Sequence, residues 1–213
     1  AHGGAELANQ LQHLAGRSDV VILGLPRGGV PVAFEVAKRL ELPLDVLLVR
    51  KLGVPGREEL AMGAIAAGAP PYLNEDVLDT LDIPADAIRS IIERETRELD
   101  RRAQAYRGER SYLPLASKVV VLVDDGLATG STMQAAVRAI RGHGPSRIVV
   151  AVPVASRQAC QSLSTVANEV VCLITPSDFQ AVGEWYDDFS QTTDDEVRVL
   201  LHQSQGFASS TSG

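Results

Sequence analysis

The stretch Val119 to Thr132, with the sequence VVVLVDDGLATGST, decides how the chain folds. Its first five residues are apolar and mostly β-branched, which is typical of a strand buried on both faces of a parallel sheet. Two carboxylates, Asp124 and Asp125, follow directly. A turn of small residues comes next, and a helical pattern of apolar residues begins at Met133. The sequence therefore predicts a buried strand, an acidic turn and a helix in direct succession.

This turn has the chemistry of a sugar-phosphate site. Backbone N–H groups of a small-residue turn, together with the positive end of a helix, attract a phosphate. The two aspartates suit neutral hydroxyls instead, or a divalent cation carried by the ligand. A ribose 5-phosphate offers both groups. The alternative is a surface turn with an N-cap threonine, which is disfavoured because adjacent aspartates repel each other. A P-loop is excluded because Gly126 to Thr132 contains no Gly-Lys-[Ser/Thr].

The pattern Asp124-Asp125-x-x-x-Thr129-Gly130-x-Thr132 after a hydrophobic strand resembles the phosphoribosyl-pyrophosphate (PRPP) signature of the type I phosphoribosyltransferases. The resemblance implies that Asp124 and Asp125 are the catalytic pair that holds the ribose 2′- and 3′-hydroxyls. They would also hold Mg²⁺, largely through water and the ligand. The residues that it assigns to the 5-phosphate are Gly126, Leu127, Ala128, Thr129, Gly130, Ser131 and Thr132.

Four more apolar runs alternate with helical patterns: Val20 to Leu25, Leu44 to Val49, Ile148 to Val154 and Val170 to Ile174. With the central strand they predict an α/β fold, a doubly wound parallel five-stranded sheet like that of the type I phosphoribosyltransferases. The 213 residues are expected to form a single domain. Its core covers about 16–175, with an insertion at about 52–110 and a small hood subdomain from about 175–205, where the family holds its base.

The insertion is harder to predict. Arg50 to Gly68 indicates a mobile loop, followed by a short antiparallel strand that pairs with Pro71 to Asn74. Ile83 to Tyr106 indicates a long charged helix with a solvated outer face.

A second candidate loop is Leu25-Pro26-Arg27-Gly28-Gly29. It is not a dinucleotide fingerprint, because proline occupies the second glycine position and no acid closes the next strand. It resembles the pyrophosphate loop of the family, which often contains a non-proline cis peptide. The resemblance therefore assigns Arg27, Gly28 and Gly29 to pyrophosphate.

Two cations, Arg50 and Lys51, close the next strand, where burial is costly unless an anion lies nearby. Similar residues of the family approach pyrophosphate, so both are assigned to it. Arg57 belongs to the loop that closes over the site in these enzymes and excludes water. It is expected to reach pyrophosphate too, although a solvated role is the alternative.

The stretch after the last strand is assigned to the base. Phe179 or Trp185 would stack on it, and Asp178 is a candidate general base. The alternative is that Trp185 and Tyr186 pack a small core of the hood itself.

Net charge, apolar runs and cysteine content predict the partners and the location of the protein. The net charge of −7 disfavours nucleic acid as a partner. No apolar run is long enough for a membrane span and no signal peptide is visible, so a cytoplasmic location is expected. Cys160 and Cys172 indicate a reducing compartment without a disulfide.

The resemblance implies a Mg²⁺-dependent transferase that moves the ribosyl 5-phosphate of PRPP to a nitrogenous base and releases pyrophosphate. Its partners would be PRPP and a small base, with neither nucleic acid nor a membrane. Members of the family often pair through a flank of the sheet, so a homodimer is allowed. The alternative function is a non-catalytic, PRPP-sensing regulatory protein of the same fold. The sequence does not predict which base is used.

Overall fold

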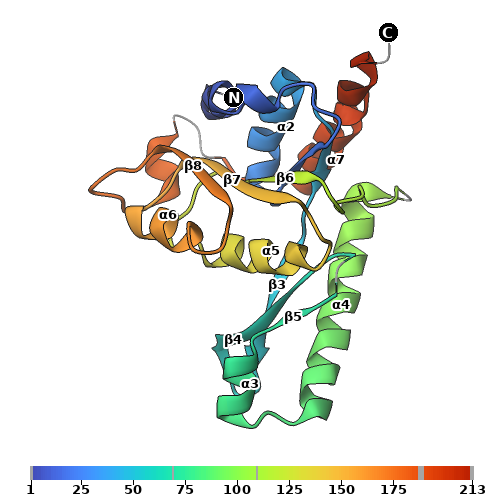
Figure 1. Cartoon of the computed structure of the whole chain (residues 1–213), viewed down its shortest axis with the longest axis vertical. Coiled ribbons are helices and arrows are strands. Elements are labelled where there is room, and N and C mark those ends of the chain that lie inside the picture. The colour runs from blue at the N-terminus through green and yellow to red at the C-terminus, as the bar shows by residue number, and fades with distance from the viewer. Residues whose placement is uncertain (1, 69, 109, 187–189, 212–213) are drawn as a thin grey trace.

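The computed structural model describes residues 2–68, 70–108, 110–186 and 190–211. Its centre is the predicted five-stranded parallel sheet (Figure 1). The strand order is β2 (Leu44–Val46), β1 (Val20–Gly24), β6 (Val119–Val123), β7 (Arg147–Val154) and β8 (Glu169–Ile174). The chain builds the sheet outward from β1 in one direction and from β6 in the other. The carboxyl ends of β1 and β6 therefore flank the switch point at which open α/β sheets bind their ligands.

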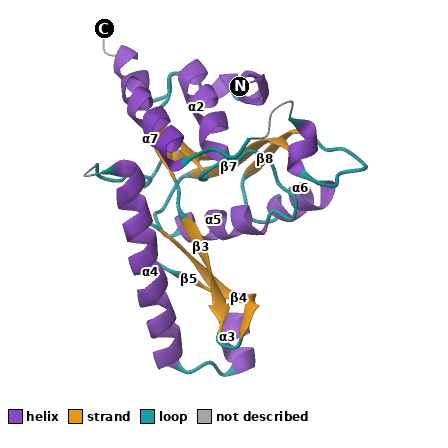
Figure 2. Ribbon diagram, turned by 180° about the vertical axis from the view of Figure 1, so that it is seen from behind, coloured by secondary structure: helices purple, strands orange, loops and turns teal. Residues whose placement is uncertain are grey.

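Helices cover both faces of this sheet (Figures 1 and 2). One layer contains α1 (His2–Gln10), α2 (Gly29–Leu40) and α7 (Asp194–Gln203), and the other contains α5 (Ser131–Arg141) and α6 (Arg157–Leu163). Successive residues of β6 alternate between two cores: Val121 packs in the core of the α1–α2 layer, and Leu122 in the core of the α5–α6 layer. This alternation explains why β6 is apolar at every position. Short 3-10 helices occupy Gln12–Leu14 (η1), Val182–Trp185 (η2) and Ser204–Thr211 (η3).

The insertion contains a second sheet, and the prediction of a mobile loop is wrong. An antiparallel sheet forms from β3 (Val49–Val54), β4 (Arg57–Ala66) and β5 (Tyr72–Leu73). The expected pairing with the 71–74 segment is confirmed, with Gly63 opposite Leu73. The hairpin was hard to predict because small residues interrupt its apolar pattern. At Gly63 a Cβ atom would lie 2.2 Å from the carbonyl oxygen of Tyr72, so the strand pairing itself requires glycine there.

Two helices complete the insertion: the unpredicted α3 (Glu75–Leu81) and the predicted long helix α4 (Ala85–Arg107). In Figure 1, α4 runs beside the small sheet and continues towards α7. Its charged residues are not all solvated as predicted, because Glu95 is buried. At its carboxyl end, Arg107 forms a buried ion pair of 2.7 Å with Asp45 of β2.

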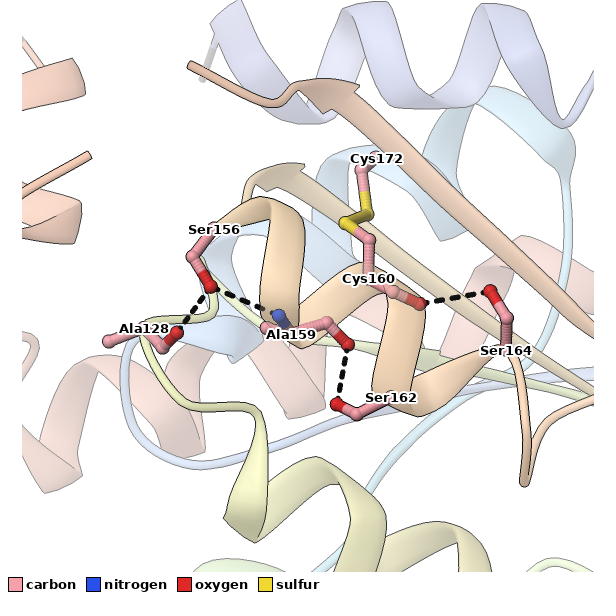
Figure 3. The surroundings of a disulfide bond; sticks show 7 residues. All are labelled: Ala128, Ser156, Ala159, Cys160, Ser162, Ser164 and Cys172. Carbon is pink, nitrogen blue, oxygen red and sulfur yellow. Dashed lines mark hydrogen bonds between the residues drawn. A yellow bond between two sulfur atoms is a disulfide. The ribbon is translucent and has the colours of Figure 1, made fainter. Parts of the chain in front are cut away.

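Cys160 and Cys172 form a disulfide, so the prediction of two unpaired cysteines is wrong. The bond joins α6 to β8 (Figure 3). The crossover from β7 to β8 packs α6 against the strand that follows it, and composition alone did not reveal that proximity. Within the described residues, no helix is both long and apolar enough to cross a membrane.

Candidate active site at the switch point

The loops after β1 and β6 lie against each other. Parallel pairing places Gly24 opposite Val123, and the backbone N–H of Leu25 donates to the carbonyl of Val123 at 2.9 Å. A Cβ atom on Gly29 would lie 2.7 Å from that carbonyl oxygen and 2.8 Å from the Cα of Asp124. Glycine is therefore required at 29 for the two loops to approach this closely.

Gly28 lies beside the second aspartate. A Cβ atom there would lie 1.9 Å from Oδ2 of Asp125. The peptide bond between Pro26 and Arg27 is cis, as the resemblance implies. The structure thus brings Gly28 and Gly29 together with the predicted catalytic pair.

The carboxylates of Asp124 and Asp125 are partly buried, and the negative charge of Asp125 disfavours ionisation of Asp124. Burial, and then the charge of Asp125, raises the pKa of Asp124 well above the usual range of an aspartate. Burial also raises the pKa of Asp125. The backbone N–H of Asp125 donates to Oδ1 of Asp124 at 2.9 Å, which fixes the first carboxylate. A pKa raised by burial and by a neighbouring charge is typical of a functional site.

The predicted phosphate loop is held from beneath by β7 and α6. The backbone N–H of Leu127 donates to the carbonyl of Val154 at 3.0 Å, so this amide serves the fold. The hydroxyl of Ser156 donates to the carbonyl of Ala128 at 2.6 Å and accepts from the N–H of Ala159, which also caps α6 (Figure 3). These hydrogen bonds fix the position of the turn from Ala128 to Thr132, which leads into α5.

The turn enters α5 through a left-handed residue. Gly130 has φ +70°, and α5 begins at Ser131. The hydroxyl of Thr129 lies 3.2 Å from that of Ser131. The helix therefore directs its positive end, flanked by two hydroxyls, at the place predicted for the 5-phosphate.

The four predicted pyrophosphate cations lie in different surroundings. Lys51 reaches the phosphate loop, with Nζ donating to Oγ of Ser131 at 2.7 Å. Arg27 has Nη1 3.8 Å from Oδ1 of Asp194 at the start of α7, and Arg50 has Nε 2.6 Å from Oε2 of Glu95 on α4. Both arginines are thus paired with carboxylates.

Arg57 lies away from these residues. It stands at the turn of the β3–β4 hairpin, opposite Val54, and lines a cavity with Leu81 and Pro84 of the α3–α4 connection. Figure 1 places this turn at the end of the molecule remote from β6. The structure does not bring Arg57 together with Gly28 and Gly29.

The stretch predicted as the hood divides into two parts, and residues 187–189 lie outside the described residues. The first part covers the phosphate loop: a Cβ atom on Gly126 would lie 2.5 Å from Val182, and the Tyr186 hydroxyl donates to the backbone carbonyl of Asp125. Burial, and then the charges of the two aspartates, raises the pKa of Tyr186. The second part, α7, packs against α2 and α4 instead.

The three residues predicted for the base lie in the first part or just before it. Asp178 is exposed, Phe179 is partly buried and Trp185 is 39% exposed. Among the described residues, none of the three has a hydrogen bond or ion pair with the aspartate pair. Tyr186, for which packing within the hood was the alternative, reaches Asp125 with its hydroxyl.

Sequence reasoning also missed the partners of the cations. Asp194 accepts from the Tyr106 hydroxyl at 2.6 Å as well as facing Arg27. Asp194 follows Thr193, which forms a capping box with Glu196. The Thr-x-x-Glu pattern was a usable signal for this helix start, but nothing in it indicates the contact with Arg27.

Known proteins resemble this chain in sequence and in structure. Residues 1–188 match the model of the phosphoribosyl transferase domain. Two Mycobacterium tuberculosis proteins, "Putative phosphoribosyl transferase Rv0571c" and "Putative phosphoribosyl transferase MT0597", are each 48% identical over 201 residues, which is 94% of this chain. The crystal structure of TT1426 from Thermus thermophilus is 45% identical, with a TM-score of 0.85 over 95% of both chains.

The chain therefore belongs to the phosphoribosyl transferase domain family. It spans about half of the length of the two mycobacterial relatives, because the match covers 45% of each.

Proposed function

We propose that the protein is a Mg²⁺-dependent phosphoribosyltransferase that transfers the ribosyl 5-phosphate of PRPP to a nitrogenous base and releases pyrophosphate. The observation that carries this proposal is the juxtaposition at the switch point. A partly buried aspartate pair lies between two structures. On one side is the loop with Gly28 and Gly29, where a side chain would clash with the pair, and on the other is the turn at the start of α5. A ribose 5-phosphate bound there would place its diol and its phosphate on complementary groups.

The aspartates act on the ribose. Asp124 and Asp125 accept hydrogen bonds from the 2′- and 3′-hydroxyls and lie close to C1, where positive charge develops as the C1–O bond breaks. Backbone amides between Ala128 and Thr132 bind the 5-phosphate, so the sugar is held at both ends. This positioning aligns the incoming base with the leaving pyrophosphate.

The cations act on pyrophosphate. Gly28 and Gly29 let the ligand approach the backbone of their loop, and Arg27, Arg50, Lys51 and Arg57 supply positive charge. Since Arg27 faces Asp194 and Arg50 faces Glu95, pyrophosphate must compete with these carboxylates for both guanidinium groups. Arg57 needs a movement of the β3–β4 hairpin to reach the same ligand.

The aspartate pair could supply some of the ligands of a Mg²⁺ ion but not all of them. Within the described residues no group of three or more His, Cys, Asp or Glu side chains could hold a metal. Two hard oxygen donors match the preference of Mg²⁺ for a few carboxylates completed by water and phosphate oxygens. When bound, the ion would neutralise charge that accumulates on the leaving pyrophosphate.

The base is proposed to lie under the segment from Asp178 to Tyr186. Phe179 or Trp185 offers an aromatic face, and Asp178 can accept a proton from the incoming nitrogen. The proposal is compatible with a homodimer, which is common in the family.

The test mixes the protein with PRPP, Mg²⁺ and a panel of nitrogenous bases and measures pyrophosphate release. Release with one base supports the transferase, and binding of PRPP without turnover on any base supports the sensing alternative. Asp125→Ala should weaken PRPP binding about 10- to 100-fold, because hydrogen bonds to a charged group are lost. Asp19→Asn, which removes a surface carboxylate paired with Arg17, is the matched control. Unchanged PRPP affinity in a folded Asp125→Ala variant would contradict the assignment.

A further inference from the structure

A polar cavity of about 220 Å³ lies beside the phosphate loop, between α5 and the β3–β4–β5 sheet. Small residues of β4 and α5 form its floor. Its polar lining residues are Lys51, Tyr72, Asn74, Ser131, Gln134 and Arg138. Ser131, Gln134 and Arg138 follow helical spacing, so the cavity runs along one side of α5, away from the turn at its start.

The charge of this cavity is uniformly positive. Lys51 and Arg138 both line it, and no carboxylate is among its described lining residues. Lys51 donates to the Ser131 hydroxyl, and the guanidinium of Arg138 lies 5.8 Å from the centre of the Tyr72 ring. Neither cation has an ion pair with a carboxylate among the described residues. In a chain of net charge −7, two such cations facing one cavity indicate an anion.

We propose that this cavity binds a phosphoryl group in addition to the 5-phosphate held by the turn at the start of α5. The two sites share Ser131, and Lys51 of the cavity is also assigned to pyrophosphate. Arginine binds phosphate through its planar fork, and lysine adds a compact point charge. The amides of Asn74 and Gln134 supply further donors around the same space. The volume is below that of cavities that enclose a drug-sized molecule, so the phosphoryl group enters and any larger part of the ligand stays outside.

Occupation of the cavity is linked to the phosphate loop through Lys51. The ammonium that lines the cavity is the one that donates to Ser131, the first residue of α5. A phosphoryl group would draw this ammonium towards itself and away from the Ser131 hydroxyl. On the proposed function above, occupation of the cavity therefore changes the affinity of the loop for a 5-phosphate.

The test is an NMR titration of the full chain with inorganic phosphate. The side-chain resonances of Arg138 and Gln134 should shift along one binding curve, and the backbone amide of Gly130 along another. Arg138→Gln should weaken the first curve at least about tenfold, since a charge-assisted hydrogen bond is lost, and should move the second curve less, because it acts on the loop only through Lys51. Arg141→Gln, one turn further along α5 and outside the cavity, is the matched control and should change neither curve.

A further titration with AMP separates the sources of the phosphoryl group. Tighter binding of AMP than of inorganic phosphate at Arg138 would identify a phosphate monoester, and equal or weaker binding would identify the free anion. No shift at Arg138 or Gln134, or a single curve that follows Gly130 in every variant, would overturn the proposal. If Arg138 and Gln134 shift but the backbone amide of Gly130 does not, the result would instead count against the proposed function.

Discussion

At the scale of single residues, the site depends on groups that are held in unfavourable surroundings. Asp124 and Asp125 are adjacent carboxylates with raised pKa values, because burial disfavours the charge on each of them. Gly29 carries no side chain because two backbone atoms occupy the space that a Cβ atom would need. Both features cost stability in the free protein and acquire a purpose if a ribose and a pyrophosphate bind beside them.

The raised pKa values predict a pH dependence of PRPP binding. Only ionised carboxylates accept freely from the ribose hydroxyls, so affinity should be complete above the raised pKa values and fall as the pH drops through them, above the usual aspartate value of about 3.9. Folding stability has the opposite sign: the pair destabilises the protein above the raised pKa, and this effect disappears as the pH falls towards the unfolded value. Calorimetric titration with PRPP at several pH values measures the first effect.

The phosphate groups of PRPP also titrate, and they do so equally with the parent protein and with the Asp124→Asn variant. A comparison of the two proteins therefore isolates the titration of Asp124. The variant should lose the pH step of Asp124 and keep that of Asp125, whose pKa is raised by burial. An identical pH profile in the variant and the parent protein would show that Asp124 does not control binding.

Gly29→Ala is expected to damage the site. The new methyl group would lie 2.7 Å from the carbonyl oxygen of Val123, so the loop after β1 must shift away from the aspartates. We expect a loss of about 1–3 kcal/mol of unfolding free energy and weaker binding of pyrophosphate. Gly206→Ala, in open space on η3, is the control in denaturant unfolding and in binding. Parent-like values for Gly29→Ala would mean that the close approach of the two loops is not needed.

At the scale of elements, α4 and α7 supply the carboxylates that face the predicted pyrophosphate cations. Asp194 stands at the start of α7 and faces Arg27 in the loop after β1. Glu95 lies in the middle of α4 and faces Arg50 of β3. These contacts tie the insertion and the C-terminal helix to the site. On the proposed function, they are the contacts that a bound pyrophosphate would displace.

Asp194→Asn should tighten the binding of pyrophosphate. The substitution removes the anion that faces Arg27 but keeps an acceptor for the Tyr106 hydroxyl. A half-exposed pair contributes about 0–1 kcal/mol, so the gain is at most about fivefold. Calorimetry with pyrophosphate and Mg²⁺ measures it, and Asp195→Asn on the same helix turn is the control. Weaker binding in the Asp194 variant would indicate that Asp194 positions Arg27 instead of competing for it.

The buried ion pair between Arg107 and Asp45 fixes the end of α4 to the edge strand β2. Both side chains are at least nine-tenths buried, and Nε and Nη1 of Arg107 have no hydrogen-bond partner among the described residues. Asp45→Asn would leave this guanidinium without its counter-charge, at a cost of about 3–5 kcal/mol of unfolding free energy. Denaturant unfolding measures it, and Asp19→Asn in the exposed pair with Arg17 should show no comparable loss. Equal effects of the two substitutions would refute a structural role for the buried pair.

At the scale of the whole molecule, the parallel sheet and its switch point were predictable, and much of the insertion was not. Buried strands such as β6 are continuous apolar runs, and the paired acids, small residues and helix start that follow β6 predict a sugar-phosphate site. The β3–β4 hairpin escaped prediction because residues such as Gly63 satisfy the backbone of a neighbouring strand and have no apolar signature. The contacts of Arg27 with Asp194 and of Lys51 with Ser131 join distant segments, so only the fold places these residues together.

The central claim is that a ribose 5-phosphate lies between the aspartate pair and the start of α5. A crystal structure of the protein with PRPP and Mg²⁺ tests it most directly. The account predicts the ribose hydroxyls within hydrogen-bond distance of Asp124 and Asp125, and the 5-phosphate against the backbone from Ala128 to Thr132. PRPP bound at another place, with these carboxylates and this turn free of ligand, would contradict it.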